Sequence, residues 1–498
     1  MKQKQNLHLQ KLKSGRSEAE SVRIDDFFNV LDRKLDLPLY GKNLIFQHFI
    51  RAFEYYQDHG TDIGEICERI DPDHLGDFYA SYQRRSYSLD NAAIIYPLGM
   101  KFGQMPMFRL SVELKEDVEP ILLQLALDFT IKRFPTFSAV IKNGFFWHYL
   151  ETTNHILQVE EEKDIPCKPI SILLRSYRSL RVLYYKKRIA VEFFHSITDG
   201  SGGMVFLKTL LGEYFRLKGK TFSYSFDVKD PDEMPDEAEL VNEFKNAQGK
   251  GDFSKFVDRK SLQLDGRLSK TGVTRIIHFI MDSDALKQVS RSYNGTVTAY
   301  LCAVIMLAAK KSIRKNDGIF NIQVPVNMRK FNHSRTLRNY SMYFNATENL
   351  SQIEDKKQLV EDIAGQIKEK GDETHMNQMM KITGKLIASL NYVPLFIKVP
   401  IAQTVYGYLS NSIIGCTLSN LGVIEVPEEL QDAVDRFQFI LMPGIPNRVT
   451  SSMVSYGKKA VFTLIKNCRE TVFEEEVYRL LKEDGLVIET EGSVEYES

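Results

Sequence analysis

Cysteine is scarce in this chain of 498 residues, and its spacing excludes the architectures that depend on it. The cysteines are odd in number and no two lie close together; they are Cys67, Cys167, Cys302, Cys416 and Cys468. This spacing gives neither a disulfide framework nor a CxxC metal site. A reducing compartment fits such usage, so we expect a cytoplasmic protein.

Net charge and long apolar runs are also missing. Lysine plus arginine and aspartate plus glutamate both number 65, which argues against bulk attraction to nucleic acid or to an anionic membrane. The longest apolar run, residues 299–309, is too short to span a bilayer and predicts a buried helix. No apolar run follows the basic N-terminus, so it does not resemble a secretory signal. We therefore expect no nucleic-acid partner and no transmembrane segment.

Composition divides the chain into a helical part and two mixed lobes. Residues 1–20 are polar and basic and predict a disordered arm, whereas residues 21–88 have helical periodicity and predict a helical extension. Strand and helix patterns alternate in residues 89–225 and 271–490, which predict an N-terminal and a C-terminal α/β lobe. Between them, residues 226–270 are acidic and proline-rich and predict an exposed, charged crossover. Its carboxylates lack the spacing of a cation-binding loop.

The predicted elements rest on apolar periodicity and on turn residues. In the first lobe they are strands at 92–97 and 108–114, a helix at 117–134, a hairpin of 180–185 with 189–194, and a helix at about 203–217. The second lobe includes a helix at 298–313, a strand at 319–326, a β pattern at 339–345, and an apolar stretch that Pro394 and Pro400 break. Apolar residues 386–409 raise the alternative of a membrane-surface segment, but we expect a buried or channel-lining helix pair there.

The chemistry of the chain centres on a histidine that follows the predicted strand 189–194. With an ordinary pKa of ~6.5, His195 suits general-base work near neutral pH. Asp199 could orient His195, pair with an arginine, or cap the helix that follows. Gly200, Gly202 and Gly203 would give the chain freedom to turn. Taken alone, a histidine at this position is more often a buried structural histidine whose ring is hydrogen-bonded by the backbone.

Two other kinds of site are disfavoured around this motif. A metal site would need a third ligand beside His195 and Asp199, and the neighbouring sequence has none, so we expect no metal. A serine hydrolase would need a Gly-x-Ser-x-Gly elbow, which is absent from the sequence.

The stretch resembles the HxxxDG motif of the chloramphenicol acetyltransferase-like superfamily, with His195, Asp199 and Gly200 at the fixed positions. This superfamily includes the BAHD acyltransferases and the condensation domains of peptide synthetases. Segments 108–110, 133–135 and 325–329 match the flanks of the family in the same order. Residues 419–422, Ser-Asn-Leu-Gly, are similar to a segment of the bacterial alcohol acetyltransferase-like branch. The resemblance covers about residues 90–485.

The resemblance implies a two-lobe α/β fold with a channel between the lobes and His195 midway along it. His195 would take a proton from a hydroxyl or amine acceptor as that group attacks the thioester of acyl-CoA. Acyl-CoA would be a co-substrate, and no bound cofactor or covalent intermediate would be needed. Asp199 would be structural and pair with an arginine, for which Arg329 is the candidate by its position in the motif. Gly200 would be the turn glycine.

This sequence departs from the superfamily at two places. Phe194 stands where condensation domains and chloramphenicol acetyltransferases often have the first of two histidines, although BAHD-like members lack it too. The plant DFGWG motif is absent, and Trp147 lies nowhere near its place. The group that stabilises the oxyanion is therefore unassigned. Ser419 and Asn420 are candidate oxyanion or channel residues, but a strand-end turn is the simpler role for Asn420.

We expect an acyl-CoA-dependent O- or N-acyltransferase that acts on a small-molecule alcohol or amine. Two alternatives stay open. One is a condensation-like transferase that depends on a carrier protein, although this chain holds no carrier domain. The other is a non-catalytic binding or scaffold protein, which the helical extension at 21–88 suggests.

Overall fold

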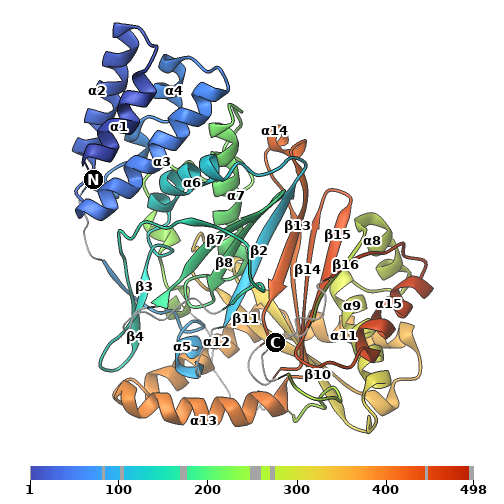
Figure 1. The fold of residues 1–498 in the computed structure, drawn as a ribbon. Helices are drawn as coiled ribbons and strands as arrows, with labels where there is room; N and C mark the ends of the chain where they lie inside the picture. The colour runs from blue at the N-terminus through green and yellow to red at the C-terminus, as the bar shows by residue number, and fades with distance from the viewer. Residues whose placement is uncertain are drawn as a thin grey trace.

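The computed structural model describes residues 2–80, 85–100, 106–168, 177–246, 259–269, 275–443 and 447–492. Two lobes of mixed α/β structure are each built on a β-sheet, and the helices of the N-terminal extension pack at one end of the first lobe (Figure 1).

The first lobe is built on a five-stranded sheet that includes a strand from far along the chain, in the order β13-β2-β8-β7-β5. The strands are β2 Met107–Leu114, β5 Val159–Glu161, β7 Leu180–Tyr185, β8 Arg188–Phe194 and β13 Val434–Leu441. The predicted strand at 108–114 and the predicted hairpin are thus present. β13 runs antiparallel to β2, with Phe437 opposite Val112. The expected second lobe is therefore not one continuous segment, because residues 434–441 complete the sheet of the first.

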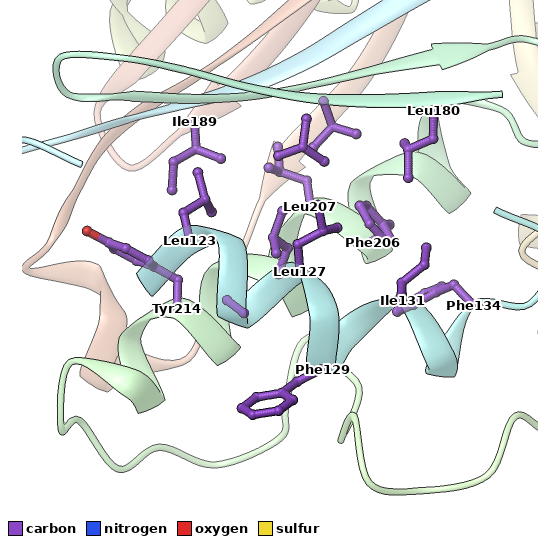
Figure 2. Close-up of a cluster of buried hydrophobic side chains, with 14 of the residues drawn as sticks. Leu123, Leu127, Phe129, Ile131, Phe134, Leu180, Ile189, Phe206, Leu207 and Tyr214 are labelled. Atoms are coloured by element: carbon purple, nitrogen blue, oxygen red, sulfur yellow. The ribbon is translucent and has the colours of Figure 1, made fainter. Parts of the chain in front are cut away.

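Two helices cover one face of this sheet: α6 (Pro120–Thr130), continued by the 3-10 turn η2 (Ile131–Arg133), and α7 (Gly200–Leu217). Figure 2 shows Leu123, Leu127 and Leu207 pointing from these helices toward the β7–β8 hairpin. α6 begins at Pro120, where proline leaves no backbone N–H unpaired, and not at the predicted residue 117. α7 begins at Gly200 and not at 203, because the side chain of Asp199 caps it.

The N-terminal helices form an extension whose core is continuous with that of the first lobe. They are α1 Lys2–Lys13, α2 Glu18–Lys34, α3 Leu39–Asp58 and α4 Ile63–Arg69, followed by the 3-10 helix η1 Pro72–Leu75. The prediction of a disordered arm over residues 1–20 is wrong. Residues 2–13 form a helix that buries Leu12, and Ser17 and Glu20 form a capping box that starts α2.

Both apolar and polar contacts join the extension to the first lobe. Phe129 of α6 points away from the sheet, and its ring centroid lies 6.0 Å from that of Phe49 in α3 (Figure 2). Beside it, His48 Nδ1 lies 2.6 Å from Asp128 Oδ2, and both side chains are buried. The extension is therefore built into the lobe and not attached as a separate module.

The second lobe is built on a seven-stranded sheet in the order β11-β10-β12-β14-β15-β9-β16. The strands are β9 Arg275–Asp282, β10 Ile319–Asn327, β11 Ser341–Asn349, β12 Cys416–Ile424, β14 Val449–Tyr456, β15 Lys459–Lys466 and β16 Glu489–Gly492. Its helices include α8 Ser283–Ser292, α9 Val297–Ser312, α11 Lys356–Lys370 and α15 Val472–Glu483. α9 is almost wholly buried, as its apolar run predicts.

Within the described ranges no single helix is long and apolar enough to span a membrane. α8 and α9 reach that length and composition only together, across a 76° bend.

The remaining elements are short helices, two longer helices and a small third sheet. They are α5 Ile95–Gly99, α10 Arg329–Asn332, α12 Glu373–Ser389, α13 Leu395–Ile413, α14 Glu428–Gln431, the 3-10 helices η3 Glu237–Glu239, η4 Glu243–Asn246 and η6 Leu350–Gln352, and a small sheet of β1 Ser86–Ser88, β3 Val140–Asn143, β4 His148–Glu151 and β6 Tyr177–Arg178. In Figure 1, α13 runs along the lower edge, away from the N-terminal helices.

Three predictions about these parts are wrong. Residues 92–97 form a turn and the start of α5, because the side chain of Asp90 accepts the Ala93 N–H at 2.9 Å and closes the turn. Pro400 does not end the apolar stretch but lies inside α13. The described part of the crossover is not simply exposed, because Glu239 is buried and pairs with Arg133.

Candidate active site

His195 lies directly after β8, where the strand leaves the sheet. Its backbone N–H donates to the Pro106 carbonyl at 2.9 Å, and its side chain stays partly exposed. The imidazole stacks on the Tyr96 ring at 4.6 Å between centroids, and the Phe108 ring meets it edge-on at 4.9 Å. These surroundings remove water from the ring, and this burial lowers the pKa of His195 below its ordinary value. The imidazole is therefore neutral near pH 7 and can accept a proton.

Asn339 fixes which nitrogen of His195 accepts that proton. His195 Nδ1 lies 3.1 Å from Asn339 Oδ1, and the asparagine is buried. An amide oxygen can only accept, so Nδ1 carries the hydrogen and donates it, which leaves the lone pair on Nε2. Asn339 lies between α10 and β11, and sequence reasoning did not find it. No spacing or motif marks it, because the contact joins residues 144 positions apart.

Asp199 makes no described contact with His195, because both of its oxygens are engaged elsewhere. Oδ1 accepts the Gly202 N–H at 3.0 Å and so caps α7. Oδ2 accepts Arg329 Nη1 at 2.9 Å and the Tyr340 N–H at 2.7 Å. Burial alone would raise the pKa of Asp199, but the arginine and these hydrogen bonds outweigh it and lower the pKa. Of the roles open to Asp199 in the sequence, the structure shows the helix cap and the arginine pair together.

Arg329 extends this contact into a clamp on the segment that carries Asn339. Its Nε donates to the Thr336 carbonyl at 2.8 Å, and Nη2 donates to the Arg338 carbonyl at 2.6 Å. One guanidinium thus joins Asp199 to the backbone on the N-terminal side of Asn339, while Tyr340 N–H binds Asp199 on the other side. The aspartate of the motif therefore orients His195 indirectly, by holding the asparagine that binds it, while its negative charge opposes the lowering of the His195 pKa.

A second ion pair ties the Tyr96 side of the histidine to the same segment. Arg338 Nη2 lies 3.6 Å from Asp90 Oδ2 and also donates to the Ser88 carbonyl. Burial raises the pKa of Asp90 to about 6, and Arg338 opposes that rise. Asp90 closes the turn that leads into α5, and α5 carries Tyr96. Tyr96 and Asn339, which both contact His195, are thus held by the same short loop, which lies between α10 and β11.

The motif glycines are required for space and not for turn freedom, which corrects the expectation. Gly200, Gly202 and Gly203 all have negative φ angles, as other residues do. A Cβ on Gly202 would lie 2.2 Å from the Leu337 carbonyl oxygen, and one on Gly200 would lie 2.7 Å from a methyl group of Leu421. These contacts bring the start of α7 against the loop before β11 and against β12.

Ser419 and Asn420 lie in β12, next to Leu421. The side-chain amide of Asn420 is already used, since Nδ2 donates to Thr298 Oγ1 at 3.1 Å and Oδ1 accepts the Gly422 N–H at 2.8 Å. This arrangement gives Asn420 the turn-forming role. Ser419 lies opposite Ser452 in the parallel pair with β14. Over the residues that the structure describes, no group of three or more His, Cys, Asp and Glu side chains could hold a metal ion.

Comparison with known proteins places the chain in a family. The family model described as alcohol acetyltransferase matches residues 172–481, more than half of the chain. The chain belongs to the alcohol acetyltransferase family. This membership confirms the resemblance that the HxxxDG motif indicated. No curated protein matches the chain.

Solved structures of this fold are similar to most of the chain. Polyketide synthase associated protein 5 from Mycobacterium tuberculosis has a TM-score of 0.56 and 12% identity, over 79% of this chain and 96% of that one. TRI3 trichothecene 15-O-acetyltransferase from Fusarium sporotrichioides has a TM-score of 0.54 and 12% identity, over 80% and 94%. F. graminearum TRI101, solved with ethyl coenzyme A, has a TM-score of 0.51 and 10% identity, over 80% and 97%. At such identities the likeness shows the fold, and it confirms the predicted two-lobe architecture.

Proposed function

We propose that this alcohol acetyltransferase family member transfers an acyl group from acyl-CoA directly to a hydroxyl or amine acceptor, with His195 as the general base. The observation that carries the proposal is a partly exposed, neutral histidine whose Nδ1–H is fixed by Asn339, so that Nε2 is the proton acceptor. The ethyl coenzyme A in the TRI101 structure supports a CoA thioester as the donor. Acyl-CoA is then a co-substrate, and the reaction requires no bound cofactor.

In the proposed reaction, Nε2 takes the proton of the acceptor O–H or N–H as the oxygen or nitrogen attacks the thioester carbonyl carbon. The C–S bond of the tetrahedral intermediate then breaks. The sulfur leaves as the CoA thiol when the imidazolium returns the proton. A thioester is reactive enough for this direct route, so no acyl group is attached to the protein. The neutral histidine and its fixed tautomer supply what the first step needs.

Asp199 and Arg329 take positioning roles in this mechanism. Their ion pair holds the backbone around Asn339, and Asn339 holds the imidazole. The group that stabilises the oxyanion stays unassigned, because Asn420 uses its amide in the β12 turn.

The decisive experiment compares His195→Ala with wild type in acyl-CoA turnover against a panel of alcohols and amines. Thiol release that depends on the acceptor should fall by about 10²- to 10⁴-fold, the usual contribution of a general base. His59→Ala, at an exposed histidine of the extension, is the matched control and should keep the wild-type rate. A His195→Ala protein that is folded and equally active would overturn the role of His195.

The same assay separates the two alternatives. Condensation domains share this fold, so transfer from an acylated carrier protein but not from free acyl-CoA would favour a carrier-dependent transferase. Absence of both turnover and acyl-CoA binding in calorimetry would favour a non-catalytic descendant of the fold.

A further inference from the structure

The outward face of α13 has the polarity of a buried face. The exposed positions in the part of this helix whose side chains are described are 396, 397, 400, 401 and 404, which share one side at helical spacing. Four of the five are apolar, and Phe396 and Ile401 are 73% and 57% exposed. The inward side packs Leu395, Val399 and Ala402 against the core. It also buries Lys398, whose Nζ donates to the Phe146 carbonyl at 2.8 Å, and half-buries Gln403, which donates to the Met100 carbonyl at 2.6 Å. α13 is therefore apolar on both sides, whereas a helix whose outer side only faced water would be polar there.

A neighbouring hairpin enlarges this apolar surface. The tip between β3 and β4 is tied to the start of α13, because the Leu395 N–H donates to the Phe145 carbonyl at 2.8 Å and Trp147 Nε1 donates to Asn391 Oδ1 at 3.1 Å. We call the set of exposed apolar side chains on the tip, on α13 and on the segment before it the α13 face; they are Phe145, Phe146, Leu386, Leu390, Tyr392, Phe396, Ile397 and Ile401. Large exposed apolar side chains in such number on elements that are joined to one another indicate a docking site.

The charged residues in the stretch that contains α13 indicate which kind of partner the α13 face binds. Between Glu373 and Glu425 the sequence has no aspartate or glutamate, although the whole chain has 65 of them. The same interval contains Lys381 and Lys385, of which Lys385 is exposed at the end of α12, and Lys398, which is buried. Exposed aromatic and aliphatic side chains in a stretch that has an exposed lysine and no acidic residue match a bilayer with anionic headgroups, which accepts both. The zero net charge of the whole chain thus does not hold for this stretch of the sequence.

We propose that the α13 face docks onto an anionic lipid surface, with Phe396 and Ile401 entering the boundary between headgroups and acyl chains. The expectation that residues 386–409 form a buried or channel-lining helix pair is wrong for these exposed positions. The docked face lies on the His195 side of the first lobe, since α13 contacts the end of α5 through Gln403 and α5 carries Tyr96.

Trp147 provides a direct optical probe, because it is the only tryptophan in the chain and it lies at the hairpin tip. The full chain is mixed with vesicles of phosphatidylcholine alone or of phosphatidylcholine with phosphatidylserine. With the anionic vesicles, the protein should float on a density gradient and the Trp147 emission should move to shorter wavelength. Equal binding to both kinds of vesicle, or binding to neither, would overturn the proposal.

Substitutions on the α13 face test whether this face is the part of the protein that binds the vesicles. Phe396→Glu with Ile401→Glu should weaken vesicle binding at least about tenfold, since two apolar side chains no longer leave water. Phe145→Glu, on the hairpin tip, tests the same face from a different element and should also weaken binding. Lys385→Gln should weaken it about fivefold at low salt, the effect expected of one cation near an anionic surface. All of these side chains are exposed, so circular dichroism should show an unchanged fold.

The matched control places glutamates at exposed valines elsewhere. Val472 begins α15, which Figure 1 shows far from α13, and Val487 follows that helix. Val472→Glu with Val487→Glu should leave vesicle binding unchanged, and an equal loss in this control would contradict the location. Self-association in sedimentation, lost in Phe396→Glu with Ile401→Glu and accompanied by no vesicle binding, would assign the face to a second copy of the chain and overturn the proposal.

Discussion

His195 is held by residues from three separate parts of the chain, and none of them belongs to the HxxxDG motif. Tyr96 and Phe108 contact the faces and edge of its ring, and Asn339 binds Nδ1. The base role that we propose for His195 therefore depends on contacts that lie outside the motif. Two predictions at the scale of single residues follow from these contacts, one for the pKa of the histidine and one for its orientation.

The first concerns the pH dependence of turnover. Burial lowers the pKa of His195, so the neutral, active form persists to lower pH than for a free histidine. The rate should be lost only as pH falls through this lowered pKa. We expect the acid limb of kcat/KM to have its midpoint below ~6.5, the ordinary pKa of histidine. A pH–rate profile measured with excess acyl-CoA checks this, and a midpoint above the ordinary value would contradict it.

The second concerns Asn339 as a positioning residue. Asn339→Ala removes the acceptor for Nδ1–H, so kcat should fall about tenfold or more while KM changes little. Asn339→Asp keeps an acceptor there and should restore much of kcat. Because its carboxylate favours the imidazolium, it should also move the acid limb to higher pH than in wild type. A merely structural role for Asn339 would lower stability in both variants without this shift of the pH profile.

At the scale of elements, the extension depends on a polar pair inside an otherwise apolar junction. His48 of α3 and Asp128 of α6 are buried, and Gln124 also donates to Asp128 at 3.2 Å. Burial raises the pKa of Asp128 despite the histidine beside it. Leaving the Asp128 carboxylate without His48 should therefore lower the stability of the fold.

We expect a single substitution in this pair to lower the free energy of unfolding and a double substitution to recover most of that loss. His48→Ala should lower the free energy of unfolding by about 3–5 kcal/mol, because it leaves a buried carboxylate unpaired. His48→Leu combined with Asp128→Leu removes both polar groups and should recover most of that loss. Urea unfolding followed by circular dichroism measures both. A double variant less stable than His48→Ala would show that the pair stabilises the junction beyond avoiding an unpaired charge.

Sequence patterns predict these elements well where the pattern and the burial agree. β2, β7, β8 and α7 follow their apolar periodicity closely. The pattern fails at residues 92–97, where the Asp90 side chain closes a turn that no apolar periodicity encodes. It fails again at α13, whose exposed side is as apolar as a core, so periodicity alone gives no direction for its burial.

For the candidate site, the sequence indicates the residues of the motif but not the residues that hold His195 in place. The motif and its flanks indicate His195, Asp199 and Arg329, and the structure has the Asp199–Arg329 pair at 2.9 Å. Asn339, Tyr96 and Asp90 could not be found in this way, because each makes its contact with a residue far away in the sequence. Long-range contacts between single side chains leave no period or spacing in the sequence.

At the scale of the whole molecule, β13 links the two lobes into one structure. It pairs with β2 in the first sheet, and its Phe439 and Leu441 carbonyls accept hydrogen bonds from Ser452 and Thr450 of β14 in the second. Opening the second lobe would strip β13 from β2 and expose the edge of the first sheet.

The two lobes should therefore unfold as one unit. Leu301→Ala, in the buried helix α9, should lower the free energy of unfolding by about 2–5 kcal/mol. If unfolding is cooperative, hydrogen exchange should show this loss to the same extent at the β2 amides of the first lobe and at the β9 amides of the second. Leu123→Ala in α6 is the reciprocal variant and should affect both strands equally as well. Faster exchange in β9 alone for Leu301→Ala, with β2 unchanged, would show that the lobes open independently and that β13 does not couple them.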